Sequence, residues 1–197
     1  MKRLHLVLTA AAMVGLSVCG SHAQAAFIMT LTQVGPNVVA SGSGTIDTAG
    51  LSLTAMSSTR SQALSMMGIL YVGPTTSTPV NFWLGTSHPL LFGTGFPSNA
   101  SSGSGDFVGI NGNSGEVVLP RAYVSDASLS DTSTWNNTTL AALGVTAGTY
   151  NWTWGTGATA DSFTLEAGVN TVPEPATFAL LGSGLLGLMF TRHRPKA

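Results

Sequence analysis

Apolar and polar residues alternate in several short segments along the middle of the chain. In residues 27–32, 51–55 and 162–166 the two kinds of side chain succeed one another with a period of two. This period predicts strands that turn one face toward a core and the other toward solvent. Short apolar runs predict further strands at residues 69–72, 81–84, 107–110 and 117–119.

Turn-forming residues separate the predicted strands. Gly, Pro, Asn and Asp gather at residues 34–37, 47–50, 73–74 and 111–113. Such clusters favour chain reversal, and residues 139–143, closed by Gly144, predict one short helical turn. Many short strands joined by turns are typical of a sandwich or jelly-roll-like domain. We therefore expect a mainly β, single-domain body at residues 26–171, without a fixed repeat.

The first 25 residues have the layout of a secretory signal peptide. Lys2 and Arg3 form a basic start, and residues 4–18 are mostly apolar. Ala23 and Ala25 then supply the small-x-small pattern that signal peptidase requires. We expect export and cleavage directly after the second of these alanines.

Two alternatives to cleavage after Ala25 concern the same segment. A retained membrane anchor is disfavoured because the apolar run is short for a membrane span. A lipid on Cys19 is disfavoured because Val18 stands where such proteins usually carry Gly, Ala or Ser. Since Cys19 is the one cysteine of the chain, cleavage would leave an exported protein without thiols or disulfides.

The C-terminal residues contain a second apolar segment. Residues 176–190 form a 15-residue run without charge, and Arg192, Arg194 and Lys196 follow it. A helix of this length spans about 22 Å, against about 30 Å for the hydrocarbon core, so it can cross with some adjustment at its ends. We predict a transmembrane helix at about 176–191, with the basic tail in the cytoplasm and the body outside.

Pro173, Glu174 and Pro175 stand directly before this segment. The two prolines favour an extended backbone, a shape that a processing enzyme can bind. Together with the apolar run and the basic tail, residues 172–194 resemble the PEP-CTERM sorting signal of Gram-negative bacteria. We therefore divide the chain into a signal peptide (1–25), a body (26–171) and a sorting signal (172–197).

The resemblance implies a route for the protein. Such proteins are exported and held in the inner membrane by the C-terminal helix, with the body in the periplasm. An exosortase, a membrane-embedded cysteine protease or transpeptidase, then processes them near the Pro-Glu-Pro motif. They reach the cell surface or the extracellular matrix and accompany exopolysaccharide production. Residues 34–45 and 148–155 also resemble segments of PEP-CTERM proteins without assigned activity.

The charge distribution limits the kinds of molecule that the body can bind. Charged residues make up 8% of the chain, against about 25% in ordinary soluble domains. Between residues 26 and 175 there are two cations, Arg60 and Arg121, against eight acids. A body without a basic patch is not expected to bind nucleic acid.

Candidate catalytic groups are sparse in the body. His88 is its one histidine, and the sequence contains neither a Gly-x-Ser-x-Gly elbow nor a P-loop. Residues 155–160 fit a G-x-G-x-x-A pattern, but the strand-like segment after them favours a hairpin turn. Asp106 and Glu116 flank a loop that could offer oxygen ligands to Ca²⁺, although their spacing fits neither the EF-hand pattern nor the nonapeptide calcium repeat. We expect no catalytic residues, no metal and no cofactor.

The strongest binding candidate is an aromatic row. Tyr150, Trp152 and Trp154 fall at a period of two and therefore share one face of a strand. Such a row can fill a sandwich core, which we favour, or can stack sugar rings. The leading hypothesis is a non-enzymatic surface or matrix protein linked to exopolysaccharide. The alternatives are a carbohydrate-binding module that uses this row, or a secreted glycan hydrolase with a carboxylate pair.

Overall fold

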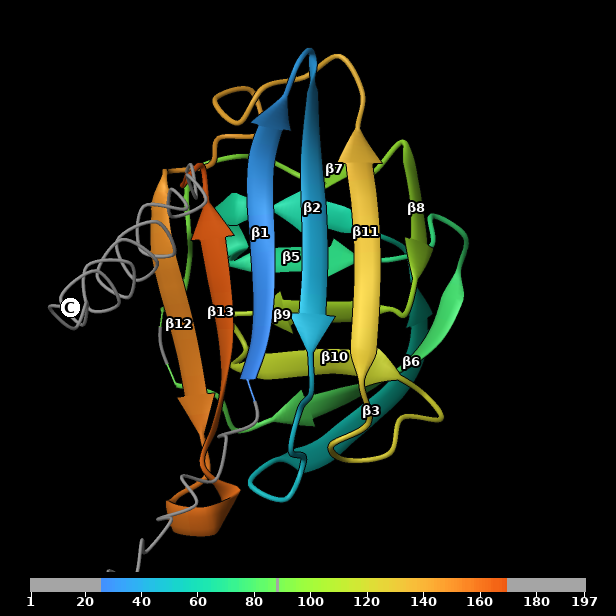
Figure 1. Ribbon diagram of the computed structural model, residues 1–197, viewed down its shortest axis with the longest axis vertical. Coiled ribbons are helices and arrows are strands. Elements are labelled where there is room, and N and C mark those ends of the chain that lie inside the picture. The colour runs from blue at the N-terminus through green and yellow to red at the C-terminus, as the bar shows by residue number, and fades with distance from the viewer. Residues whose placement is uncertain (1–25, 88, 170–197) are drawn as a thin grey trace, which may run out of the picture.

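The computed structural model describes residues 26–87 and 89–169 of the chain. The expected signal peptide, His88 and the expected sorting signal lie outside the described residues. Within the described ranges the chain forms two β-sheets that pack face to face (Figure 1). Figure 1 shows the strands of one sheet crossing those of the other at a large angle, which is the arrangement of an orthogonal sandwich.

The six-stranded sheet contains the first and the last strand of the described body. In order, its strands are β12 (Gly148–Trp154), β13 (Asp161–Ala167), β1 (Ala26–Val34), β2 (Asn37–Gly44), β11 (Leu129–Trp135) and β8 (Ser102–Gly105). Neighbouring strands run antiparallel except β1 and β13, which run parallel. The end of the chain thus returns to lie beside its beginning.

The seven-stranded sheet covers the other side of the core and is antiparallel throughout. In order, its strands are β3 (Ser52–Thr59), β6 (Thr78–Leu84), β10 (Glu116–Pro120), β9 (Val108–Asn111), β5 (Ile69–Val72), β4 (Gln62–Leu64) and β7 (Ser98–Asn99). Two short 3₁₀ helices complete the described elements, η1 (Ser65–Met67) and η2 (Gly157–Thr159). The prediction of a mainly β body is confirmed.

The core lies between the sheets, where alternate residues of each inner strand meet. Phe27, Met29 and Leu31 of β1 are fully buried, as their period of two predicts. Phe163 and Leu165 of β13 are buried on the same side, and the rings of Phe27 and Phe163 stack with centroids 5.4 Å apart. Full burial of each such side chain contributes roughly 1.5–3 kcal/mol to stability.

Parallel pairing of β1 with β13 separates the two termini of the body. Leu31, near the end of β1, pairs with Ala167 at the end of β13, and the Gly168 amide donates to the Leu31 carbonyl at 2.8 Å. The body therefore begins at one end of the sandwich and finishes at the other (Figure 1). We call the end at which β13 finishes, which also carries the loop at residues 136–147, the exit end.

Strand β3 differs from its prediction in one respect. The alternation in residues 51–55 predicts a buried face, yet the residues from Ser52 to Ser58 are all exposed, and only Leu51, just before the strand, is buried. The reason is that β3, at an edge of its sheet and paired with β6 alone, is not covered by the six-stranded sheet; its register shifts between Leu53 and Ala55. The prediction of a strand is confirmed, and the prediction that one of its faces is buried is wrong.

Strands β2 and β11 were not expected from the apolar pattern, although both lie inside the six-stranded sheet. Strand β11 turns Asp131 and Ser133 toward the core beside two apolar residues, which hides its period. The buried Ser133 hydroxyl donates to the Gly73 carbonyl and accepts from the Gly73 amide, both at 3.0 Å. Because these bonds satisfy the hydroxyl, its burial is tolerated.

Two predicted turns are present. The Leu143 amide donates to the Thr139 carbonyl at 3.0 Å, which closes one helical turn, and Gly144 follows with a φ of 61°. Residues 155–160 join the antiparallel strands β12 and β13, so they form the hairpin turn that was favoured over a nucleotide-binding turn.

Candidate functional site

The aromatic row of β12 belongs to the core. Trp152 has 0% of its surface exposed, Trp154 is also buried, and Tyr150 is partly buried. The ring centroids of Tyr150 and Trp152 lie 6.4 Å apart, and Trp152 also packs edge-on against Phe163 at 5.9 Å. Neither indole therefore offers a free face to a sugar ring, and of the row only Tyr150 keeps part of its surface exposed.

The polar atoms of the row bind neighbouring loops instead of a ligand. The indole nitrogens of Trp152 and Trp154 donate to the carbonyls of Pro89 and Asp47, at 2.6 and 2.8 Å. The Tyr150 hydroxyl donates to the Thr146 carbonyl at 2.9 Å. Each aromatic side chain thus fixes one loop to the six-stranded sheet.

Asp106 and Glu116, which flank the loop considered as a source of calcium ligands, do not lie together. Glu116 lies beside the turn between β9 and β10, where it pairs with Asn111. Asp106 lies at the opposite end of β9, two residues before the strand begins. The Asp106 carboxylate accepts from the Ser130 amide at 2.9 Å. The Glu116 carboxylate accepts from the hydroxyls of Thr54 and Ser114, at 3.0 and 2.5 Å. The two carboxylates therefore stabilise different loops, and residues 26–87 and 89–169 contain no cluster of three metal-ligating side chains.

A group of carboxylates lies at the end opposite the exit end, which we call the acidic end. Asp161 opens β13 there, and its buried carboxylate accepts from the amides of Asp47 and Ser162, both at 2.6 Å. Burial raises the pKa of Asp161 to about 6, although these two amides oppose the shift. Asp47 and Asp126 add a smaller rise because their charges repel the Asp161 carboxylate. Asp161 therefore caps the loop that follows β2.

Asp131 is the most unusual carboxyl among the described residues. It lies on the inner face of β11 with 4% of its surface exposed, and neither of its oxygens has a hydrogen-bond partner. Burial raises its pKa to about 7; the nearby Gly42 backbone amide opposes this rise, and the charge of Asp106 adds to it. Because the group faces the core and not a cleft, it has no access to a glycan chain. Its burial could not be read from the sequence, since it stands in a run of Ser and Thr.

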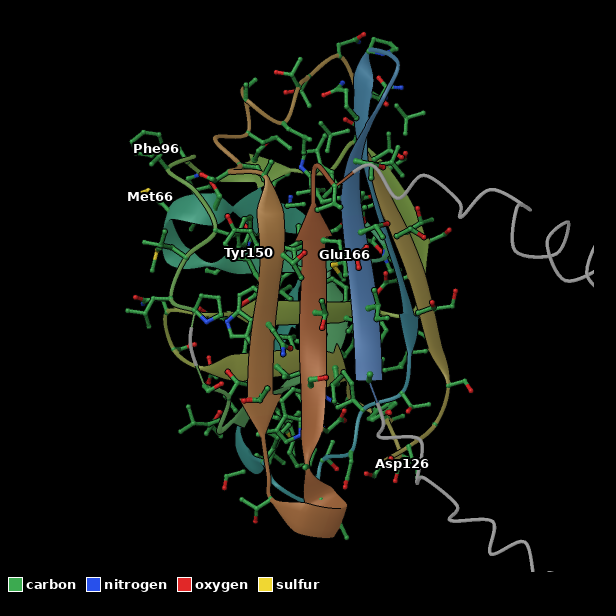
Figure 2. All side chains as sticks on the ribbon, turned by 60° about the vertical axis from the view of Figure 1, so that its left-hand side comes forward. Met66, Phe96, Asp126, Tyr150 and Glu166 are labelled. Carbon is green, nitrogen blue, oxygen red and sulfur yellow. The ribbon has the colours of Figure 1, made fainter. Side chains whose placement is uncertain are left out.

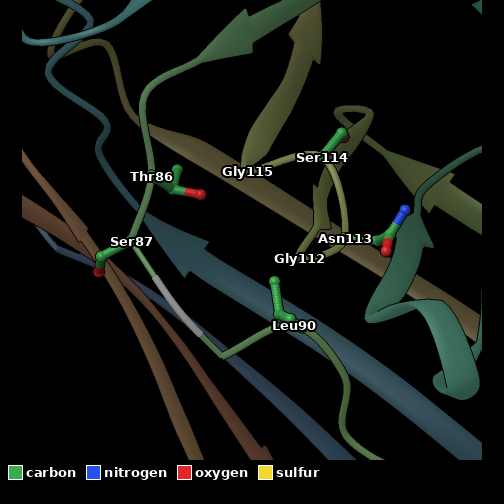
Figure 3. Close-up of a pocket in the computed structure, with 7 residues that line it drawn as sticks. All are labelled: Thr86, Ser87, Leu90, Gly112, Asn113, Ser114 and Gly115. Atoms are coloured by element: carbon green, nitrogen blue, oxygen red, sulfur yellow. The ribbon is translucent and has the colours of Figure 1, made fainter.

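One shallow pocket of about 200 Å³ opens between two loops of the described chain. Figure 3 shows its lining, which consists of Thr86, Ser87, Leu90, Gly112, Asn113, Ser114 and Gly115. The described lining is neutral and offers hydroxyls, an amide and backbone groups. The Thr86 hydroxyl oxygen is buried without a hydrogen-bond partner. The pocket is smaller than the roughly 300–1,000 Å³ typical of small-molecule sites.

Comparison with known proteins identifies the sorting signal. Residues 171–194 match the PEP-CTERM protein-sorting motif, which confirms the resemblance found in the sequence. The matched range contains Pro173, Glu174 and Pro175 as well as Arg192 and Arg194. The motif supports an exosortase-targeted surface protein. Neither the curated proteins nor the solved structures gave a match.

The matched motif lies outside the described residues, as do the expected signal peptidase site at Ala23 and Ala25, the expected transmembrane helix and Lys196. In the described part of the chain, no helix is both long enough and apolar enough to cross a membrane. The described body ends at Val169, two residues before the motif begins.

Proposed function

We propose that the protein is a non-enzymatic surface or matrix protein that works beside exopolysaccharide. Signal peptidase removes residues 1–25, and residues 176–191 hold the body in the inner membrane with the sandwich in the periplasm. An exosortase then acts near Pro173–Pro175, and the body reaches the cell surface or the extracellular matrix. The observation that carries this proposal is the sorting motif, which follows the last strand of the body closely in the sequence.

The arrangement of the carboxylates supports a structural role for the body. A glycosidase needs two carboxyl groups on either side of a substrate cleft. Here Asp161 caps a loop, Asp131 is buried in the core, and Glu116 accepts hydrogen bonds from two neighbouring hydroxyls. Two of these acids hold loops in place and the third is enclosed in the core, which fits a scaffold better than a hydrolase.

The outer face of the six-stranded sheet supports a link to polysaccharide. Outward Ser and Thr side chains stand in register across neighbouring strands. We call the following set the hydroxyl face: Thr30, Ser41, Ser43, Ser104, Ser130 and Thr132. Neighbouring strands are about 4.8 Å apart, so these hydroxyls form a regular neutral array. Hydroxyls both donate and accept, as sugar hydroxyls do, so such an array can hydrogen-bond a glycan chain.

The sorting step is tested by replacing Pro173, Glu174 and Pro175 with alanine in the native host. We expect the full-length protein to accumulate in the membrane fraction, because the exosortase loses its motif. Pro97→Ala, which changes an exposed proline of the body, is the matched control and should be processed normally. Unchanged processing of the triple variant would refute the sorting step.

The polysaccharide link is tested by co-sedimentation of the protein with exopolysaccharide from the same cells. The triple variant Ser41→Ala, Ser43→Ala, Ser130→Ala should bind less, because it removes hydroxyls from the centre of the hydroxyl face. The control removes three exposed serines from β3, at Ser52, Ser57 and Ser58, and should bind normally. Equal binding of both variants would contradict the link.

The non-enzymatic part of the proposal has a separate test. The body is incubated with a panel of polysaccharides, including the exopolysaccharide of the host, and the release of reducing sugar is measured. We expect none, and any release above that of a heat-denatured sample would overturn this part.

A further inference from the structure

An exposed apolar patch lies where η1 meets the loop before β7. The patch consists of Met66, Met67, Leu90, Leu91 and Phe96. Phe96 exposes 77% of its surface and Leu91 exposes 51%. Exposed apolar side chains that gather in one place, unlike scattered ones, mark an interaction surface.

Backbone contacts make these residues one surface. The Met66 amide donates to the Gly95 carbonyl at 3.2 Å, which brings η1 beside Phe96. The Phe92 amide donates to the Ser65 carbonyl at 3.1 Å, which brings the same element beside Leu91. Figure 2 shows the side chains of Met66 and Phe96 projecting outward next to each other.

The two stretches of chain that form the patch and pack against it carry no charge, while Glu116 of the neighbouring β10 is hydrogen-bonded to Ser114, which lines the pocket beside Leu90. No Asp, Glu, Lys or Arg occurs between Arg60 and Asp106, the stretch that contains the whole patch, and none occurs between Asp131 and Asp161. The second stretch includes the loop at residues 136–147, which packs against the loop at residues 89–97, which we call the patch loop. The nearest acid on β13 is Glu166, which lies on the outer face of the six-stranded sheet and not on the side of the patch (Figure 2).

The patch lies close to the point at which the chain leaves the described body. Gly93, inside the patch loop, forms a β-bridge with Val145. Two residues further on, Ala147 packs against Gly168, where a Cβ would lie 3.1 Å from the Ala147 Cβ. The sorting motif begins at residue 171, and an extended chain covers at most about 3.5 Å per residue, so the motif starts within about 10 Å of Gly168.

We propose that the apolar patch docks on the surface of the lipid bilayer in which the sorting signal is held. This inference rests on the proposed function, because it requires the tethered state. Phe, Leu and Met side chains insert about 5–10 Å into the boundary between headgroups and acyl chains. The body is thereby fixed with its exit end at the membrane.

The distribution of charge favours this orientation. Asp47, Asp126 and Asp161 lie at the acidic end, where the Asp126 amide donates to the Ile46 carbonyl and the Asp47 amide donates to Asp161. Anionic headgroups repel acidic side chains over about 10 Å at ordinary ionic strength. Docking through the neutral patch keeps these acids on the side of the sandwich away from the headgroups.

The experiment places one fluorescent probe on the patch and a matched probe at the acidic end. Protein of residues 26–197, the chain left after removal of the signal peptide and free of native cysteine, receives either Phe96→Cys or Val124→Cys, which are 77% and 71% exposed. Val124 is two residues from Asp126 and is therefore the control for an exposed apolar site far from the exit end. Each variant is labelled with an environment-sensitive dye and reconstituted into vesicles of phosphatidylethanolamine and phosphatidylglycerol.

Quenching by a lipid spin-labelled near its headgroup is then compared between the two probes. Insertion to the expected depth should quench the probe at position 96 by about twofold or more and leave the probe at position 124 almost unchanged. Equal quenching at the two positions would overturn the docking proposal. A probe at position 96 that is shielded from aqueous iodide but not quenched by the lipid would also overturn it, since another protein surface would then cover the patch.

Flotation of the same vesicles separates this proposal from the one on which it rests. If the protein floats with the vesicles and position 96 is not quenched, the tether stands and the docking surface is wrong. If the protein does not float, the membrane tether itself fails.

Discussion

The unpaired Asp131 carboxyl should make the stability of the body depend on pH. Burial raises its pKa from the ordinary 3.8 to about 7 in the folded protein. Between these values the folded state binds one proton more than the unfolded state, so the free energy of unfolding falls as the pH rises. Three pKa units correspond to about 4 kcal/mol of destabilisation, fully present above about pH 7 and absent below about pH 4.

Asp131→Asn removes the charge while keeping the shape of the side chain. We expect this change to raise the free energy of unfolding by up to about 4 kcal/mol at about pH 8 and to leave it almost unchanged at about pH 4. Urea unfolding of residues 26–171, followed by tryptophan fluorescence, measures the difference. Asp161 contributes equally to the pH dependence of the native protein and of the variant, so its contribution cancels in the difference.

Asp106→Asn is the matched control for the effect of Asp131. Asp106 is only partly buried and accepts a hydrogen bond from the Ser130 amide, so its replacement should bring no comparable gain at about pH 8. If Asp131→Asn is no more stable than the native protein at the higher pH, the ionised carboxylate finds water or a partner. The reasoning from its isolation would then be refuted.

Three further substitutions test the packing. Gly42→Ala places a Cβ 2.6 Å from an oxygen of Asp131 and should cost about 1–3 kcal/mol of unfolding free energy in urea titrations. Ser65→Ala removes the hydroxyl that accepts from the Gly95 amide at 2.7 Å; it should cost about 1–3 kcal/mol and speed proteolysis of the adjoining loop. Trp152→Ala should cost about 3–5 kcal/mol by the same titration, and a variant of native stability would contradict its place in the core.

The sequence identified strands whose inner faces are apolar, and it failed where those faces are polar. The period of two in β1 and β13 is plain because each of their inward positions but one, Asp161 at the start of β13, is apolar. Strand β11 has the same period, but Asp131 and Ser133 occupy inward positions, so its pattern resembles a loop. The failure at β3 has another cause, because a residue pattern does not show that a strand lies at the edge of a sheet.

The candidate sites also differ in how far they could be predicted, because some depend on a local sequence pattern and others depend on the fold. The sorting signal was predictable because its three parts are consecutive in sequence, and a local pattern requires no knowledge of the fold. The spacing of Tyr150, Trp152 and Trp154 shows that they share a face but not whether a second sheet covers it. The loop flanked by Asp106 and Glu116 failed as a calcium site because strand β9 separates the two carboxylates.

The sandwich closes before the sorting motif begins, and this bears on how the body survives processing. Strand β13 pairs with β12 on one side and with β1 on the other. Asp161 fixes its start through the amide of Asp47, and the Gly168 amide closes its end on Leu31. These bonds all lie upstream of residue 171, so a cut near Pro173–Pro175 removes none of them. We therefore expect the processed body to unfold at the same urea concentration as the body within the intact chain.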